Sequence, residues 1–89
     1  MTVYQKELMY LLQNKFGQLS NAQLIEKLSE IGVLDFILCK VLVVREFVNA
    51  LQRTGVKKID AMWIASEKFA CTYEYIRKCM YYYTDVGLN

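Results

Sequence analysis

The 89-residue chain is the length of one domain, and 55% of its residues are apolar, which predicts a packed core rather than disorder. It contains no histidine, so the commonest general base and the commonest metal ligand are both missing. No nucleophile has a base beside it in the sequence, and no glycine-rich loop could cradle a phosphate. These features argue against an enzyme and predict neither cofactor nor metal.

The formal net charge is only +2, and the whole excess lies in residues 51–89. This uneven placement is a mild signal for nucleic acid, well below that of a strongly basic domain. The three cysteines are odd in number and form no CxxC pair, which predicts reduced thiols in the cytoplasm. Lys40 interrupts the longest apolar run, so no membrane span is expected. Acidic Glu7 and the absence of a cleavage site argue against a signal peptide.

The first two predicted helices begin with matching signals. Thr2 and Ser20 are each followed three residues later by a glutamine, the spacing of a capping box. Leucine and isoleucine recur through both segments at helical spacing. Glycine tolerates the left-handed conformation that ends many helices, so we expect the two helices to stop at Gly17 and Gly32.

A third helix is predicted over residues 36–53, between the N-cap Asp35 and Gly55. Its first half, FILCKVLVV, is apolar on almost every face, which indicates either a buried central helix or the seam of a homodimer. The β-branched residues in this run would also suit a strand. We prefer a helix because the segment is long and the chain offers no second strand to pair with it.

Residues 57–83 predict two further helices, Lys57 to Glu67 and Thr72 to Tyr83, followed by a frayed tail. Apolar residues stand where a helix-turn-helix holds its turn: Ala65, Phe69, Cys71, Ile76 and Cys79. The sequence therefore predicts a single all-α domain over 1–89, a compact bundle of about five helices. Residues 1–55 would be the scaffold and possible dimerisation helices, and residues 57–83 the helix-turn-helix.

The second helix of this unit has two faces at 100° per residue. We expect Tyr75, Ile76, Cys79 and Tyr83 on the buried side. The free side offers cations, phenols and a carboxylate that suit phosphates and base edges. We predict Arg77 as the base reader, and Lys57, Lys58 and Lys78 as phosphate contacts. The predicted DNA-binding residues are Lys57, Lys58, Thr72, Tyr73, Glu74, Arg77, Lys78 and Tyr81.

The run AMWIASEKFACTYEYIRKCMYYY resembles the helix-turn-helix of bacterial and phage transcription regulators, including Mor-type activators and the Trp-repressor-like group. The matching positions are Glu67, Lys68, Phe69, Thr72, Ile76 and Arg77. The resemblance covers the C-terminal third of the chain and implies a second helix that contacts bases, often in a dimer. One departure is Ala70, which stands where such motifs often have glycine and would cost about 1 kcal/mol at a positive φ.

The leading hypothesis is a small cytoplasmic, bacterial or phage-type transcription regulator that binds double-stranded DNA with helix 72–83. A homodimer through helix 36–53 would set two such helices about 34 Å apart, one turn of DNA. The alternative is a helical protein-interaction module with a tyrosine-rich docking surface and no DNA binding. Trp63 is expected in the core rather than at the site, and Tyr75 and Tyr83 as partly buried rings.

Overall fold

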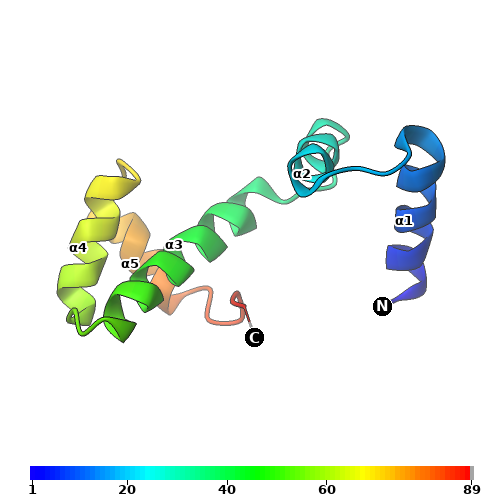
Figure 1. Ribbon diagram of the computed structural model, residues 1–89. Coiled ribbons are helices and arrows are strands. Elements are labelled where there is room, and N and C mark those ends of the chain that lie inside the picture. Colours follow the sequence, from blue (N-terminus) through cyan, green and yellow to red (C-terminus); the bar gives the residue numbers. More distant parts are fainter. Residues whose placement is uncertain (89) are drawn as a thin grey trace. The chain divides into compact units, whose positions relative to one another are not determined.

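The computed structural model describes residues 1–88. It contains the helices α1 (Val3–Phe16), α2 (Asn21–Glu30), α3 (Phe36–Arg53), α4 (Lys58–Lys68) and α5 (Tyr73–Tyr81) (Figure 1). No strand occurs among the described residues. The prediction of an all-α chain with about five helices is confirmed, and residues 36–53 are a helix rather than a strand.

Local side-chain caps start most of these helices where the sequence predicted them. Thr2 and Ser20 both form complete capping boxes, in which a side-chain oxygen accepts from the N–H three residues later and the glutamine there accepts in return. Asp35 Oδ1 accepts from the Leu38 N–H at 3.0 Å. The largest difference is at the end of α5, which stops at Tyr81, two residues before the predicted Tyr83.

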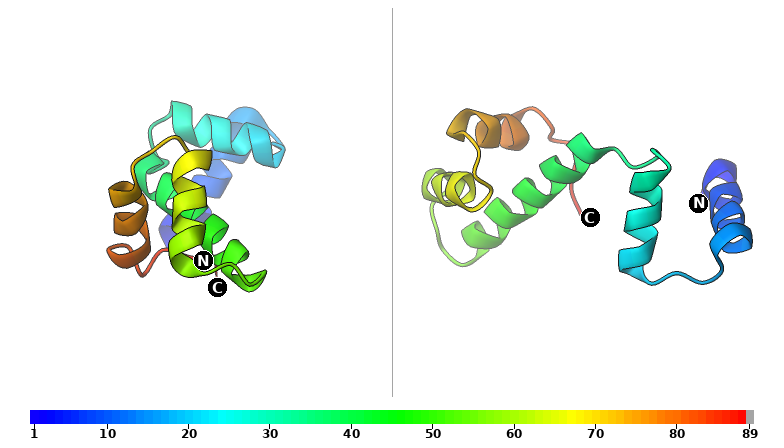
Figure 2. Two further views of the ribbon diagram at one scale, coloured as in Figure 1. Left: turned by 90° about the vertical axis from the view of Figure 1, so that its left-hand side faces the viewer. Right: turned by 90° about the horizontal axis from the view of Figure 1, so that it is seen from above.

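Contacts divide the chain into two compact units, residues 1–34 and the residues from Asp35 onward. The sequence predicts that helix 36–53 belongs with the first two helices, whereas α3 packs against α4 and α5 within the second unit. Figures 1 and 2 both show α4 and α5 lying against α3.

The core of the second unit is formed by one stripe from each of its three helices. Two of the core residues, Ala61 and Ala65, are small alanines on α4 that let the helices approach closely. The nine buried residues are Val41, Val44, Val48, Ala61, Met62, Ala65, Ile76, Cys79 and Met80. Fully burying one of the larger of these side chains contributes about 1.5–3 kcal/mol. This shared core fixes where α5 lies, and therefore which of its faces remains exposed.

Helix α3 is less enclosed than its composition suggested. The buried residues are spaced three and four apart along one stripe, while Phe36, Ile37 and Val43 are 65%, 61% and 53% exposed. The interpretation as a central helix buried on all sides is therefore wrong for its first half. The exposed apolar side chains of this half leave the alternative prediction, the seam of a homodimer, open.

The residues after α5 are held against the second unit rather than frayed. Val86 packs against the core, and its carbonyl oxygen accepts a hydrogen bond from Arg45 Nε at 2.6 Å. The predicted frayed tail is wrong for this part of the segment, because α3 supplies both an apolar contact and a charged donor. The predicted tail also includes Asp85, Gly87 and Asn89, of which Asn89 lies outside the described residues.

Candidate nucleic-acid interface

The turn between α4 and α5 is a four-residue link, 69–72, held by backbone and side-chain hydrogen bonds. The Cys71 N–H donates to the Ser66 carbonyl at 3.1 Å, and the Ala70 N–H donates to the Glu67 carbonyl at 3.3 Å. This pair is the Schellman arrangement, which requires a left-handed residue after the helix. Ala70 takes that role with φ 50°, so the condition under which an alanine at this position costs about 1 kcal/mol is met.

Two hydroxyl groups fix the turn further. Ser66 Oγ donates to the Cys71 carbonyl at 2.7 Å, so the Ser66 side chain joins the end of α4 to the link. Thr72 Oγ1 accepts from the Tyr75 N–H at 3.1 Å and is the N-cap of α5, as predicted. The Thr72 hydroxyl, predicted as a DNA contact, is therefore engaged in capping.

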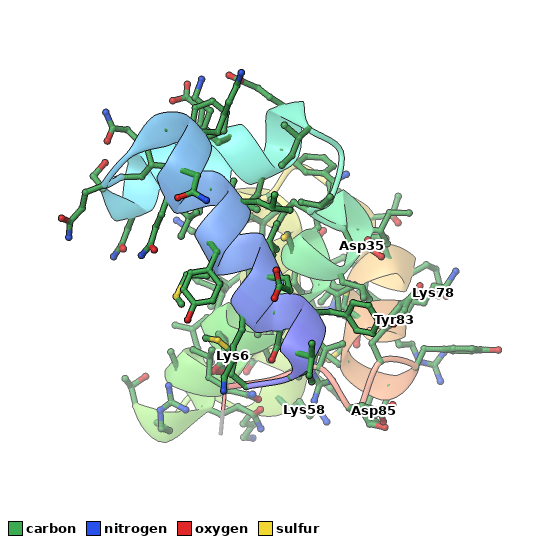
Figure 3. The ribbon with its side chains drawn as sticks, turned by 90° about the vertical axis from the view of Figure 1, so that its right-hand side faces the viewer. Lys6, Asp35, Lys58, Lys78, Tyr83 and Asp85 are labelled. Carbon is green, nitrogen blue, oxygen red and sulfur yellow. The ribbon has the colours of Figure 1, made fainter. Side chains whose placement is uncertain are left out.

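Most of the predicted binding residues of α5 share one exposed face. Ile76, Cys79 and Met80 are buried on the opposite side of the helix. A shallow open depression of about 530 Å³ follows the exposed side and is lined by Glu74, Tyr75, Arg77, Lys78, Tyr81 and Tyr82. Lys78 projects outward from α5 (Figure 3). Within residues 1–88, neither Arg77 nor Lys78 is engaged in a salt bridge.

The two lysines at the start of α4 have different environments. Lys57 is the N-cap of α4, is exposed, and its side chain makes no capping hydrogen bond. Lys58 is half-buried, and its Nζ lies 4.3 Å from the centre of the Tyr81 ring. This cation–π contact joins the start of α4 to the end of α5 and holds two predicted contact residues together.

Tyr73 and Trp63 occupy positions that sequence reasoning did not anticipate. Tyr73 was placed on the free face of the helix, but it is half-buried and its ring stacks on Trp63, with centroids 4.3 Å apart and planes 24° apart. Trp63, expected in the core, is 54% exposed. The angle between α4 and α5 brings these rings together, and helical spacing alone cannot reveal it.

Arg45 is a structural residue of this unit that the sequence analysis passed over. Its Nη1 donates to the carbonyl oxygens of Cys79 at 3.0 Å and Met80 at 2.8 Å, near the end of α5. A cation at the C-terminus of a helix also offsets the negative end of the helix dipole. The signal was available: Arg45 lies four residues after Val41, on the buried stripe of α3, where an unpaired charge would be costly.

Burial changes the acidity of two side chains of α5, the half-buried Tyr75 and the buried Cys79. It raises the pKa of the Tyr75 phenol, and it raises the pKa of the Cys79 thiol against the opposing effects of the Tyr75 hydrogen bond and Arg45. Tyr75 and Tyr83 are half-buried, as predicted. A neutral, buried thiol is a poor nucleophile, so Cys79 supports the core rather than chemistry.

Membrane-spanning helices and metal-binding groups were sought in the described part of the chain, and related proteins were sought for the chain as a whole. None of the helices in residues 1–88 is both long and apolar enough to cross a membrane. Over the same residues, no group of three or more cysteine, aspartate or glutamate side chains is placed to hold a metal ion. In comparisons with protein families, curated proteins and solved structures, nothing matches this chain.

Proposed function

We propose that the protein binds double-stranded DNA, with the exposed face of α5 entering the major groove. The observation that supports this most directly is the placement of Glu74, Arg77, Lys78 and Tyr81 along one open depression, opposite the buried side of the helix. An α-helix fits the major groove, where a guanidinium can bind the two acceptors of guanine. The rigid turn and the α3 packing behind α5 support a preformed recognition surface.

The roles within this surface follow from side-chain chemistry. Arg77 reads a base edge, because its planar fork suits the O6 and N7 acceptors of guanine. Lys57 and Lys78 hold phosphates, as does the α4 N-terminus, where free backbone N–H groups favour an anion. Lys58 contributes charge from its position over the Tyr81 ring. The short link between α4 and α5, residues 69–72, is of the length that joins the two helices of a helix-turn-helix.

A homodimer through α3 would complete this proposal. The uncovered Phe36, Ile37 and Val43 supply an apolar seam on its first half. Two copies related by a two-fold axis would present two α5 helices to successive major grooves, about 34 Å apart. The second copy would also double the modest excess of positive charge, which a weakly basic monomer needs for phosphate binding.

Replacing Arg77 with Ala tests whether its guanidinium recognises a base edge in the major groove. DNA selected by the parent protein from a random pool should bind Arg77→Ala about 1–3 kcal/mol more weakly, while binding to scrambled DNA changes much less. Lys78→Ala should weaken binding to both DNAs and lower the salt dependence by about one phosphate contact. Lys15→Ala, in the other unit, is the control of equal charge and should change neither. Titrations by fluorescence anisotropy at several salt concentrations provide the measurement.

The alternative is a protein-docking surface, and the exposed tyrosines give it specific support. Tyr81 and Tyr82 are 55% and 80% exposed beside the depression, and tyrosine is enriched at protein interfaces. If the parent protein retains no DNA even at low salt, DNA binding is wrong and this alternative is favoured. If DNA binding is salt-sensitive but Arg77→Ala leaves it unchanged, Arg77 is not the residue that recognises a base edge.

A further inference from the structure

The exposed face of α5 carries one carboxylate among its cations and phenols. Glu74 is exposed, lies in the first turn of the helix, and lines the same open depression as Arg77 and Lys78. A carboxylate on a surface that approaches phosphates is repelled by them, which weakens binding unless the carboxylate accepts a hydrogen bond from the DNA. Glu74 therefore restricts which DNA this face can accept.

The Glu74 carboxylate is not neutralised by the cations that follow it. Arg77 and Lys78 stand three and four residues later, the spacings at which a glutamate and a cation pair along a helix. Within residues 1–88, however, Glu74 takes part in no salt bridge. The Lys78 ammonium instead lies 6.0 Å from the centre of the Tyr82 ring. Glu74 and Arg77 are thus available as an acceptor and a donor on one face.

In the major groove, an acceptor and a donor select different bases. Only cytosine and adenine present an amino group there, so the Glu74 carboxylate favours these two bases and is repelled by the acceptors of guanine and thymine. Adenine also presents the N7 acceptor beside its amino group, whereas cytosine presents its N4 amino group alone. Cytosine is therefore the base that suits a carboxylate, just as guanine, with two acceptors, suits the guanidinium of Arg77.

The spacing of these two side chains is close to the spacing of bases. Three residues of an α-helix rise about 4.5 Å, and successive base pairs of DNA are about 3.4 Å apart. Base edges are contacted by the N-terminal residues of a recognition helix, and Glu74 and Arg77 both lie in the first five residues of α5. The carboxylate and the guanidinium can therefore reach neighbouring base pairs.

We propose that α5 recognises a cytosine at one base pair and a guanine at the next, with Glu74 accepting a hydrogen bond from cytosine N4 and Arg77 donating to guanine O6 and N7. This inference rests on the DNA binding proposed above and adds the class of site that is bound. Glu74 acts mainly against other sites, because its charge is repelled wherever no amino group faces it. The target is a duplex with adjacent cytosine and guanine rather than any duplex.

Duplexes that the parent protein selects from a random pool provide the sites for the test. They should contain adjacent cytosine and guanine, and changing either pair to A·T should weaken binding about tenfold. Glu74→Gln should change the preference at the cytosine alone to adenine, because a glutamine amide pairs with adenine N6 and N7. Arg77→Ala should abolish the preference for guanine at the neighbouring pair alone. Fluorescence anisotropy at one salt concentration measures each affinity.

Glu67→Gln is the matched control, because it removes the same charge from an exposed position of α4 outside the depression. It should leave both base preferences unchanged. The ring of Trp63 stacks on Tyr73, the residue before Glu74, so unchanged Trp63 emission in Glu74→Gln shows that the start of α5 is intact. A change in base preference can then be assigned to the carboxylate.

Three results would overturn the proposal. If Glu74→Gln strengthens binding to all duplexes equally, the carboxylate only repels phosphates. If the variant leaves base preference unchanged, Glu74 serves only the positive end of the helix dipole at the start of α5. If Glu74→Gln and Arg77→Ala affect the same base pair, the two side chains do not recognise neighbouring pairs.

The same measurements separate this inference from the DNA binding on which it rests. If the parent retains no duplex at low salt, DNA binding itself is wrong, and the assignment of Glu74 is wrong with it. If the parent binds duplexes in a salt-sensitive manner but selects no cytosine beside a guanine, DNA binding stands and only the proposed class of site is wrong.

Discussion

Ala70 stands where Gly32 and Gly55 stand at the ends of α2 and α3. All three helices end in the same pair of backbone hydrogen bonds, and the left-handed residues have φ values of 50°, 79° and 100°. Glycine adopts this conformation freely, whereas a Cβ raises its energy by about 1–2 kcal/mol. The strain at Ala70 is therefore offset by the rest of the turn, including the Ser66 hydroxyl.

Replacing Ala70 with glycine should stabilise the protein. We expect the free energy of unfolding to rise by about 0.5–1 kcal/mol, because relief of the left-handed strain exceeds the extra freedom of glycine in the unfolded chain. Urea unfolding followed by Trp63 fluorescence measures the change. Ala50→Gly, at an exposed helical position of α3, is the control and should lower stability by about 0.5–1 kcal/mol. A loss of stability in Ala70→Gly similar to that control would contradict the assignment of strain.

At the scale of elements, Arg45 joins α3 to the end of α5 and to the segment after it. One guanidinium donates to the carbonyls of Cys79, Met80 and Val86. The first two lie near the C-terminus of α5, where carbonyls lack partners within the helix. A single side chain of α3 thereby binds both the end of α5 and the segment after it, and it helps to hold the exposed face of α5 in place.

Removing these bonds should loosen the second unit. Arg45→Met should lower the free energy of unfolding by about 1.5–3 kcal/mol, because it keeps an apolar side chain but leaves three part-buried carbonyls without their charged donor. Arg45→Lys should recover only part of this loss, since an ammonium lacks the fork of a guanidinium. The same urea unfolding measures both variants. Arg53→Met, at an exposed position of α3, should change stability by less than about 0.5 kcal/mol, and equal losses at both positions would contradict this role.

At the scale of the whole molecule, stability should depend on alkaline pH through the second unit. Burial raises the pKa of Tyr75 above its ordinary 10.0 and that of Cys79 above its ordinary 9.0. Both are neutral when protonated, so the unfolded chain releases these protons at lower pH than the folded chain does. Deprotonation then favours the unfolded chain as the pH rises past the pKa values of the unfolded state, so the free energy of unfolding falls.

The free energy of unfolding should therefore decrease from pH 9.0 upward, first through Cys79 and then, above pH 10.0, through Tyr75. Urea unfolding at neutral pH and above pH 10.0 measures the decrease. A Cys79→Ala, Tyr75→Phe double variant removes both protons and should show a smaller decrease relative to its own value at neutral pH. An equal decrease in parent and variant would assign the alkaline loss to other groups, such as the lysines.

The sequence by itself determined the helices and their ends. Thr2, Ser20, Asp35 and Thr72 were predictable as caps because each acts on a backbone N–H three residues away. The two faces of α5 were largely predictable for the same reason, since helical periodicity places Ile76 opposite Glu74, Arg77 and Lys78.

Only the tertiary structure decided which helix faces are covered. Composition suggested a fully buried α3, but α4 and α5 bury only one stripe of that helix, Val41, Val44 and Val48. Phe36 and Ile37 lie off this stripe and remain exposed. The Trp63–Tyr73 stack depends on the angle between two helices, and the Arg45 bonds join residues 34 to 41 positions apart. Interactions within one helical turn can be read from sequence order, whereas contacts across the fold depend on how the helices pack.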